Sequence, residues 1–128
     1  MQRRPALSLG DELAFIERTM GDGNTRIDEI DLVLVGANGD SALDALYAGV
    51  VGGLRTRAPG IAAGVYRHGT GDFAAASALG FDLAVRAVHR GSLPAEGHVV
   101  EGTVRKVERV LLYHLTSTGY HSAIVVSA

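Results

Sequence analysis

Cysteine and tryptophan are missing from this chain of 128 residues, and aromatic residues make up only 5% of it. Without cysteine, the chain has no disulfide, no thiolate ligand for a metal and no thiol nucleophile. This composition suits a reducing cytoplasm, which is where we expect the protein to reside. Because aromatic side chains are few, the core must be built from alanine, valine and leucine, with 17 glycines allowing close backbone contact.

Charge of one sign and long apolar runs are also scarce. The formal charge is −2 with both signs interspersed, so no basic stripe is offered to a nucleic acid. No segment approaches membrane-spanning length, and Asp11 and Glu12 interrupt the apolar stretch near the amino terminus, which argues against a signal peptide. The length and the 47% hydrophobic content fit one globular domain. We therefore expect neither nucleic acid nor membrane as a partner.

The order of apolar runs and turn residues predicts a layered α/β protein. Residues 1–26 are expected to form an N-terminal arm with one short helix at 9–20, closed by the turn-rich GDGNT. Residues 27–128 follow the order β-α-β-α-β-β, with strands in LVLV, GIAAGVY, VERVLLYHL and SAIVVSA. Helices are expected at 42–54 and 72–90. Such alternation favours a mixed sheet, parallel at first and antiparallel at its end.

The stretch YRHGTGDFAAASALGF, residues 66–81, leads into an unusual helix. Small side chains all round its first two turns predict that this helix is enclosed, because a surface helix would carry a polar stripe there. Four strands and two helices cannot easily enclose it within one chain. We therefore expect its first turns to pack against another subunit through Ala75, Ala76, Ser77 and Gly80.

Two loops between strands and helices hold the candidate site residues. In GANGDSALD, residues 36–44, Asp40 and Asp44 lie one helical turn apart at the place where α/β sheets bind ligands, although Asp40 can simply cap the helix. In the second loop, His68 and Asp72 could form an acid–base pair, and the alternative is a hydrogen-bonded loop histidine beside a capping aspartate. No P-loop, nucleophile elbow or zinc spacing is present, so we expect no cofactor and no metal.

Three segments resemble the C-terminal half of the thiolase-fold condensing enzymes, the β-ketoacyl synthases. IDEIDLVLVGANGDSALD resembles the family stretch with the first catalytic histidine, and Asp44 matches the aspartate that ends it. YRHGTGDFAAASALGF resembles the segment with the second histidine, with Arg67 in a lysine place and Asp72 in the histidine place. TSTGYHSAIVV is similar to the glycine-rich turn near the family's C-terminus. The resemblance covers about residues 27–128.

The departures from this family point to a member without catalysis of its own. Gly36 and Asp72 stand in the two histidine places, and the cysteine-bearing N-terminal half has no counterpart in these residues. Condensation in the family needs the cysteine to hold the acyl chain, and the histidines to help decarboxylation and to stabilise developing charge. The closer resemblance is to the chain-length-factor-like members of aryl polyene and flexirubin pigment clusters. They share an Asn-Gly-Asp loop and a His-x-x-Gly-acid-aromatic segment, here Asn38 to Asp40 and His68 to Phe73.

The resemblance implies a half-length subunit that completes a thiolase fold with a second chain. Implied partners are a cysteine-bearing ketosynthase chain or a second copy of this chain, with an acyl carrier protein, in fatty acid, polyketide or aryl polyene biosynthesis. The implied substrate or tunnel residues are Asn38, Asp40, Asp44, Gly71 and Phe73. Two alternatives stay open, namely a small acyl-processing enzyme that uses His68 and Asp72, and a homo-oligomeric fragment without acyl chemistry.

Overall fold

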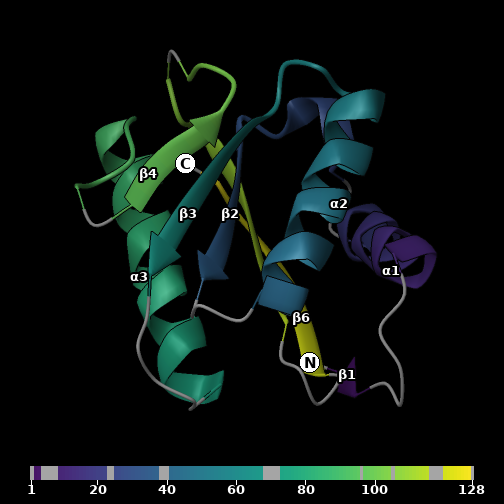
Figure 1. The fold of residues 1–128 in the computed structure, drawn as a ribbon. Coiled ribbons are helices and arrows are strands. Elements are labelled where there is room, and N and C mark those ends of the chain that lie inside the picture. The colour runs from purple at the N-terminus through teal and green to yellow at the C-terminus, as the bar shows by residue number, and fades with distance from the viewer. Residues whose placement is uncertain are drawn as a thin grey trace.

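The computed structural model describes residues 2–3, 9–22, 25–37, 41–67, 73–95, 97–104, 106–115 and 120–127. These residues form three α-helices and one mixed sheet of six strands (Figure 1). The helices are α1 (Leu9–Asp22), α2 (Ser41–Arg57) and α3 (Phe73–Arg90), and a 3-10 turn spans Ile27–Glu29. The strands are β1 (Gln2–Arg3), β2 (Leu32–Ala37), β3 (Ala62–Arg67), β4 (Gly97–Glu101), β5 (Arg109–Leu115) and β6 (Tyr120–Ser127).

The strands lie in the order β1-β6-β5-β2-β3-β4. β2 is central and runs parallel to both β3 and β5, while β4 and β6 run antiparallel to their neighbours β3 and β5. The prediction of an α/β protein with a mixed sheet is therefore confirmed, and so is the antiparallel pair at its C-terminal end. Its apolar central strands are typical of a sheet that is covered on both faces.

Strand β4 was not predicted from the sequence. Gly97–Glu101 is short, and His98 lies exposed on this strand. β4 pairs with β3 across an irregularity between Ala63 and Gly64. A weak strand sequence becomes a strand here because β3 offers it a free edge with unpaired backbone groups, and such a partner cannot be recognised from a local pattern.

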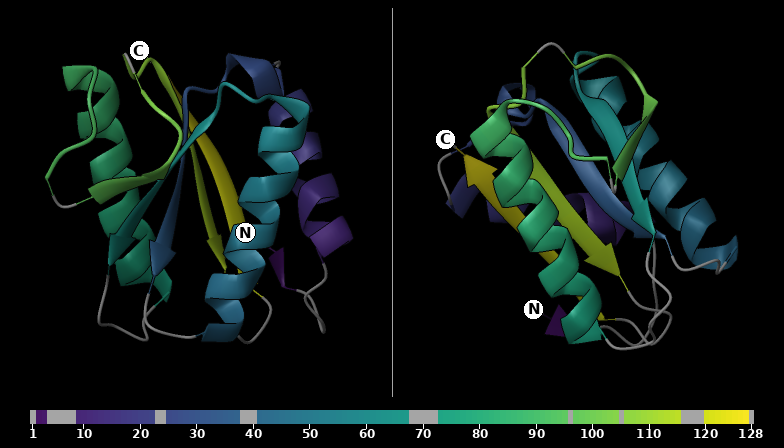
Figure 2. Two further views of the ribbon diagram at one scale, coloured as in Figure 1. Left: turned by 45° about the horizontal axis from the view of Figure 1, so that its top comes forward. Right: turned by 90° about the vertical axis from the view of Figure 1, so that its left-hand side faces the viewer.

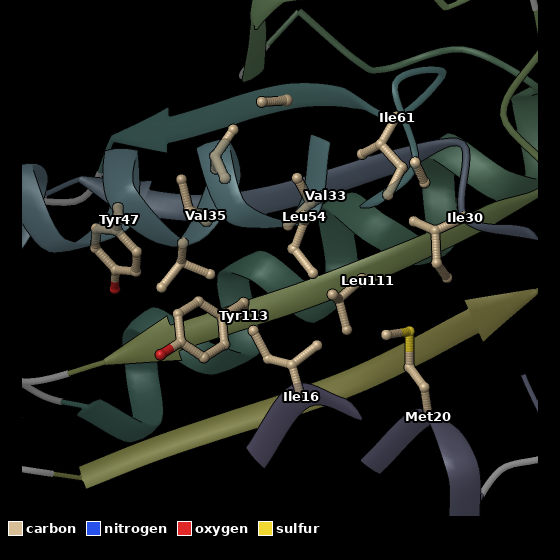
Figure 3. Packing of buried hydrophobic residues seen from close by; sticks show 14 residues of the cluster. Ile16, Met20, Ile30, Val33, Val35, Tyr47, Leu54, Ile61, Leu111 and Tyr113 are labelled. Carbon is tan, nitrogen blue, oxygen red and sulfur yellow. The ribbon is translucent and has the colours of Figure 1, made fainter. Parts of the chain in front are cut away.

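The helices cover the two faces of the sheet unequally. α1 and α2 pack together over one face, whereas α3 lies alone across the other, as both views of Figure 2 show. The core between the sheet and α1 and α2 includes Ile16, Val33, Leu54, Leu111 and Tyr113 (Figure 3). Because Ile16 and Met20 are buried in it, α1 contributes to the same core as the sheet.

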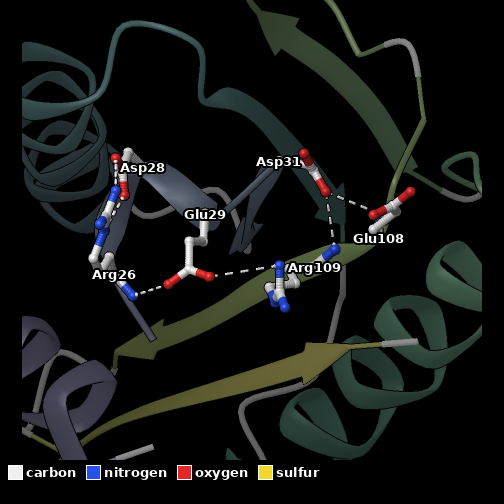
Figure 4. A network of polar contacts seen from close by, with 6 residues as sticks. All are labelled: Arg26, Asp28, Glu29, Asp31, Glu108 and Arg109. Atoms are coloured by element: carbon white, nitrogen blue, oxygen red, sulfur yellow. Dashed lines mark hydrogen bonds and ion pairs between the residues drawn. The ribbon is translucent and has the colours of Figure 1, made fainter. Parts of the chain in front are cut away.

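A polar network joins β2 to β5 at the edge of the sheet where both strands begin (Figure 4). The carboxylate of Asp31 accepts hydrogen bonds from the backbone N–H groups of Glu108, at 2.9 Å, and Arg109, at 3.0 Å. Glu29 accepts a bond from the backbone of Arg26 and lies 3.8 Å from the Arg109 guanidinium. These contacts fix the start of β5 against β2, so the two strands end together at the opposite edge.

Candidate functional site

The carboxyl ends of β2 and β3 meet at one edge of the sheet, where Ala37 pairs with Arg67. The chain leaves these paired ends toward α2 and α3, and α/β folds commonly bind ligands at such an edge. The predicted site residues Asn38, Asp40, His68, Gly71 and Asp72 belong to these connections and lie outside the described residues. Five others lie where only the helical backbone is described, namely Asp44 in α2 and Phe73, Ala75, Ala76 and Ser77 in α3.

Gly80 is the predicted interface residue whose surroundings the structure describes. It is buried and faces the sheet of its own chain. A Cβ atom at this position would lie 2.5 Å from the hydroxyl oxygen of Tyr66 and 2.9 Å from a methyl carbon of Leu112. The glycine therefore allows α3 to approach β3 and β5 closely.

Tyr66 and His114 form a buried polar pair beneath α3. The hydroxyl oxygen of Tyr66 lies 3.2 Å from Nδ1 of His114, and the two residues are only 0% and 2% exposed. They come from β3 and β5, on either side of β2. Gly36, which pairs with Tyr66, is the β2 residue between them and brings no side chain to separate them. Gly36 thus leaves room for this pair.

Burial raises the pKa of the Tyr66 phenol well above its ordinary value, and the nearby Tyr47 adds a smaller effect in the same direction. Burial has this effect because it disfavours the charged phenolate. The phenol therefore stays protonated at physiological pH, and the imidazole tautomer sets the direction of the hydrogen bond to His114. Because both groups are closed to solvent, we interpret the pair as a structural contact beneath α3.

Replacing Tyr66 by phenylalanine is expected to lower the free energy of unfolding by about 1 kcal/mol, the usual net contribution of a buried hydrogen bond. Urea titration of the purified protein measures this loss. The double variant Tyr66→Phe/His114→Leu removes both partners of this hydrogen bond and should recover part of the stability, since neither residue of the pair then keeps a polar group that has lost the other. A single variant as stable as the wild type would contradict the structural role of the pair.

Among the described residues, five of the six exposed large hydrophobic residues lie on the α3 side of the molecule, and the sixth is Val100 on β4, which is 58% exposed. On the helix these are Leu79, Phe81 and Val85, with exposed fractions of 38%, 47% and 41%. Ile124 on β6 and Val99 on β4 are 40% and 42% exposed. Their strand partners, Leu112 and Gly64, place both of them on the face of the sheet that α3 covers. We call Leu79, Phe81, Val85, Val99 and Ile124 the α3 surface.

The opposite helical layer has a different outer surface. Its exposed positions carry small or polar residues, namely Ala14, Glu17 and Arg18 on α1 and Ala45, Ala48, Gly52, Thr56 and Arg57 on α2. Glu17 and Arg57 form an ion pair between the two helices. Among the described residues, the helical layer with a markedly apolar outside is therefore α3.

The sequence prediction concerned the first turns of this helix and did not include the exposed apolar side chains that follow. Phe81 and Val85 are four residues apart, which puts them on one side of a helix, and Leu83, Ala84 and Ala87 line the buried side. The signal for these exposed residues was available in the sequence, because α3 has apolar residues on two of its sides. A helix that is covered on one side only would carry polar residues on the other.

A pocket of about 320 Å³ lies beside the end of α3, away from the predicted site. It is lined by Gly91, Ser92, Leu93, Val99, Gly102, Thr103 and Val104. Gly102 packs against Ala62, the first residue of β3, so the pocket opens where β3 begins and the candidate loops lie where β3 ends. It therefore adds no group to the site that the sequence predicts.

Comparison of the chain with protein-family models, curated proteins and solved structures gives no match. Within the described residues, no helix combines the length and apolar character needed to cross a membrane. The function is therefore inferred from the sequence motifs, from the fold and from the α3 surface.

Proposed function

We propose that the chain is a non-catalytic, β-ketoacyl synthase-like subunit of the chain-length-factor type. In this proposal it completes a thiolase-like fold through the α3 surface and serves a cysteine-bearing condensing enzyme in fatty acid, polyketide or aryl polyene biosynthesis. The exposure of Leu79, Phe81 and Val85 on one helix is the observation that carries the proposal.

An exposed apolar helix face favours a protein–protein interface. Monomeric soluble proteins rarely leave large contiguous apolar patches open to water, because covering such surface contributes about 25 cal/mol for each Å². In the thiolase fold, two similar halves enclose their central helices between two sheets. The described chain supports a half of this kind, since one face of its sheet carries two helices and the other carries α3 alone (Figure 2).

The residues at the candidate site support a role in which this chain does not catalyse the reaction itself. The chain contains no cysteine, and on the proposed resemblance Gly36 and Asp72 take the places of the two histidines of the condensing enzymes. His114 lies on β5 near the same edge of the sheet, but it is buried and contacts Tyr66. We propose that the loops after β2 and β3, with Asn38 and His68, position the acyl chain while the partner's cysteine performs the condensation.

The proposal predicts that binding of the condensing enzyme to this chain depends on Phe81. A tagged chain is expressed in its own cells, purified and analysed by native mass spectrometry, beside the variants Phe81→Asp and Ala48→Asp. The two variants introduce the same charge at exposed helix positions, one on α3 and one on α2. A condensing-enzyme chain with its active-site cysteine should accompany the wild type and Ala48→Asp. We expect Phe81→Asp to lose at least about 90% of it, because a buried charge without a partner disrupts an apolar interface.

Recovery of the same condensing enzyme with Phe81→Asp would show that the α3 surface does not support docking. Absence of any condensing enzyme from the wild-type complex would contradict the proposed function itself. Circular dichroism of both variants serves as the folding control, and both are expected to match the wild type.

A further inference from the structure

We propose that the α3 surface binds a second copy of this chain, with the two α3 helices antiparallel about a twofold axis that crosses the outer side of α3 at the level of Ala84 along the helix. This inference rests on the proposed function, since the pair of chains would make one complete thiolase-like unit for the condensing enzyme to bind. The partner is identified as a second copy by the pattern of charges on α3 in addition to its exposed apolar residues.

Two opposite charges on the outside of α3, Asp82 and Arg86, can pair with each other between two antiparallel copies of the helix. Asp82 and Arg86 form an ion pair at 3.1 Å along the helix, and their side chains are 61% and 32% exposed. Asp82 lies two residues before Ala84 and Arg86 two residues after it. An antiparallel twofold arrangement therefore places each Asp82 opposite the partner's Arg86, which forms two ion pairs between the subunits. A parallel arrangement would instead place like charges side by side.

The apolar side chains match in the same arrangement. Measured along the helix at about 1.5 Å of rise per residue, Phe81 lies about 4.5 Å before the axis. Val85 and Val88 lie about 1.5 and 6 Å after it. All three side chains point in similar directions around the helix. A twofold axis perpendicular to the helix therefore brings the row of three against the same row in the partner. Phe81 of each chain then fits between the partner's Val85 and the partner's Val88. One axis thus places Asp82 opposite the partner's Arg86 and Phe81 between the partner's Val85 and the partner's Val88.

The twofold arrangement also uses the rest of the α3 surface. Ile124 and Val99 lie on the same face of the sheet as α3, on strands at opposite sides of β5, β2 and β3. Together with the helix they widen the patch beyond a single helix pair. A self-complementary surface of this kind is what an isologous dimer requires.

Sedimentation velocity tests the inference by measuring the dimer dissociation constant of the purified chain. The variants are Asp82→Arg and Arg86→Asp, each compared with the wild type. Each variant alone places like charges opposite each other twice, so each should weaken the dimer at least about tenfold. An equal mixture of the two variants restores both intersubunit ion pairs and should return the dimer to within about threefold of the wild type. The mixture is decisive because neither chain in it has the ion pair within its own helix.

Dimers that persist in either single variant, or a mixture that stays monomeric, would overturn the antiparallel arrangement. A purified wild-type chain that is monomeric, while a condensing enzyme still binds in a Phe81-dependent way, would overturn self-association and leave the proposed function standing. The reverse result, with a dimer that responds to charge as predicted but no condensing enzyme in cells, would retain the dimer and reject the function.

Discussion

Replacing Gly80 by alanine is expected to destabilise the protein by about 1–3 kcal/mol, although the same change within a helix usually stabilises it. The new methyl group would lie 2.5 and 2.7 Å from two atoms of the Tyr66 phenol and 2.9 Å from Leu112. Tyr66 has little freedom to move, because it is fully buried and bonded to His114. Either α3 or β3 must therefore shift, and urea titration measures the cost.

Gly52→Ala is the matched control for Gly80→Ala. Gly52 is an exposed glycine of α2, and a Cβ atom there would meet nothing within 4 Å. It should stabilise the protein by about 0.5–1 kcal/mol, because alanine has the higher helix propensity. Opposite signs for the two substitutions would confirm that Gly80 sets the distance between α3 and the sheet. A stabilising effect at both positions would show that α3 is not seated on Tyr66.

Replacing Ile16 by alanine is expected to cost about 2–5 kcal/mol of unfolding free energy, the usual range for truncating a buried isoleucine. Ile16 is fully buried and packs in the same cluster as Leu54 and Leu111, although it lies in the predicted N-terminal arm, residues 1–26. Its truncation would leave a cavity between α1, α2 and the sheet. The effect is measured by urea titration, with the slope of the transition as a check on two-state behaviour.

Arg18→Ala is the control on the same helix, because Arg18 is exposed and its loss should change stability by less than about 0.5 kcal/mol. If Ile16→Ala were equally mild, α1 would be an arm that detaches from the sheet without consequence. A large loss at Ile16 alone would show that the domain needs α1 in order to fold.

The sequence revealed most of the helices and strands because their signals are local. The LVLV run predicted β2, and the valine-rich pair of segments at the end of the chain predicted β5 and β6. The limits of α3 were also close to those predicted, since Arg90 and Gly91 end the helix as expected. Its left-handed glycine, Gly91, is a common helix terminator.

The remaining features depend on contacts between distant parts of the chain. Tyr66 and His114 are 48 positions apart, and their contact depends on Gly36 lying between their strands. The small residues of α3 suggested an enclosed helix that packs against another subunit, and no local pattern shows that Gly80 faces the sheet of its own chain. The exposure of Phe81 likewise depends on which side of the helix the sheet covers.

Site-specific photo-crosslinking tests the central claim, that another chain covers the α3 surface, most directly. A photoreactive residue replaces Val85 in one preparation and Ala48 in another, each as an equal mixture of isotope-labelled and unlabelled chains. The account predicts crosslinks from position 85 that join α3 peptides of labelled and unlabelled chains, with none from position 48. The absence of crosslinks between chains at position 85, or equal yields at both positions, would contradict it.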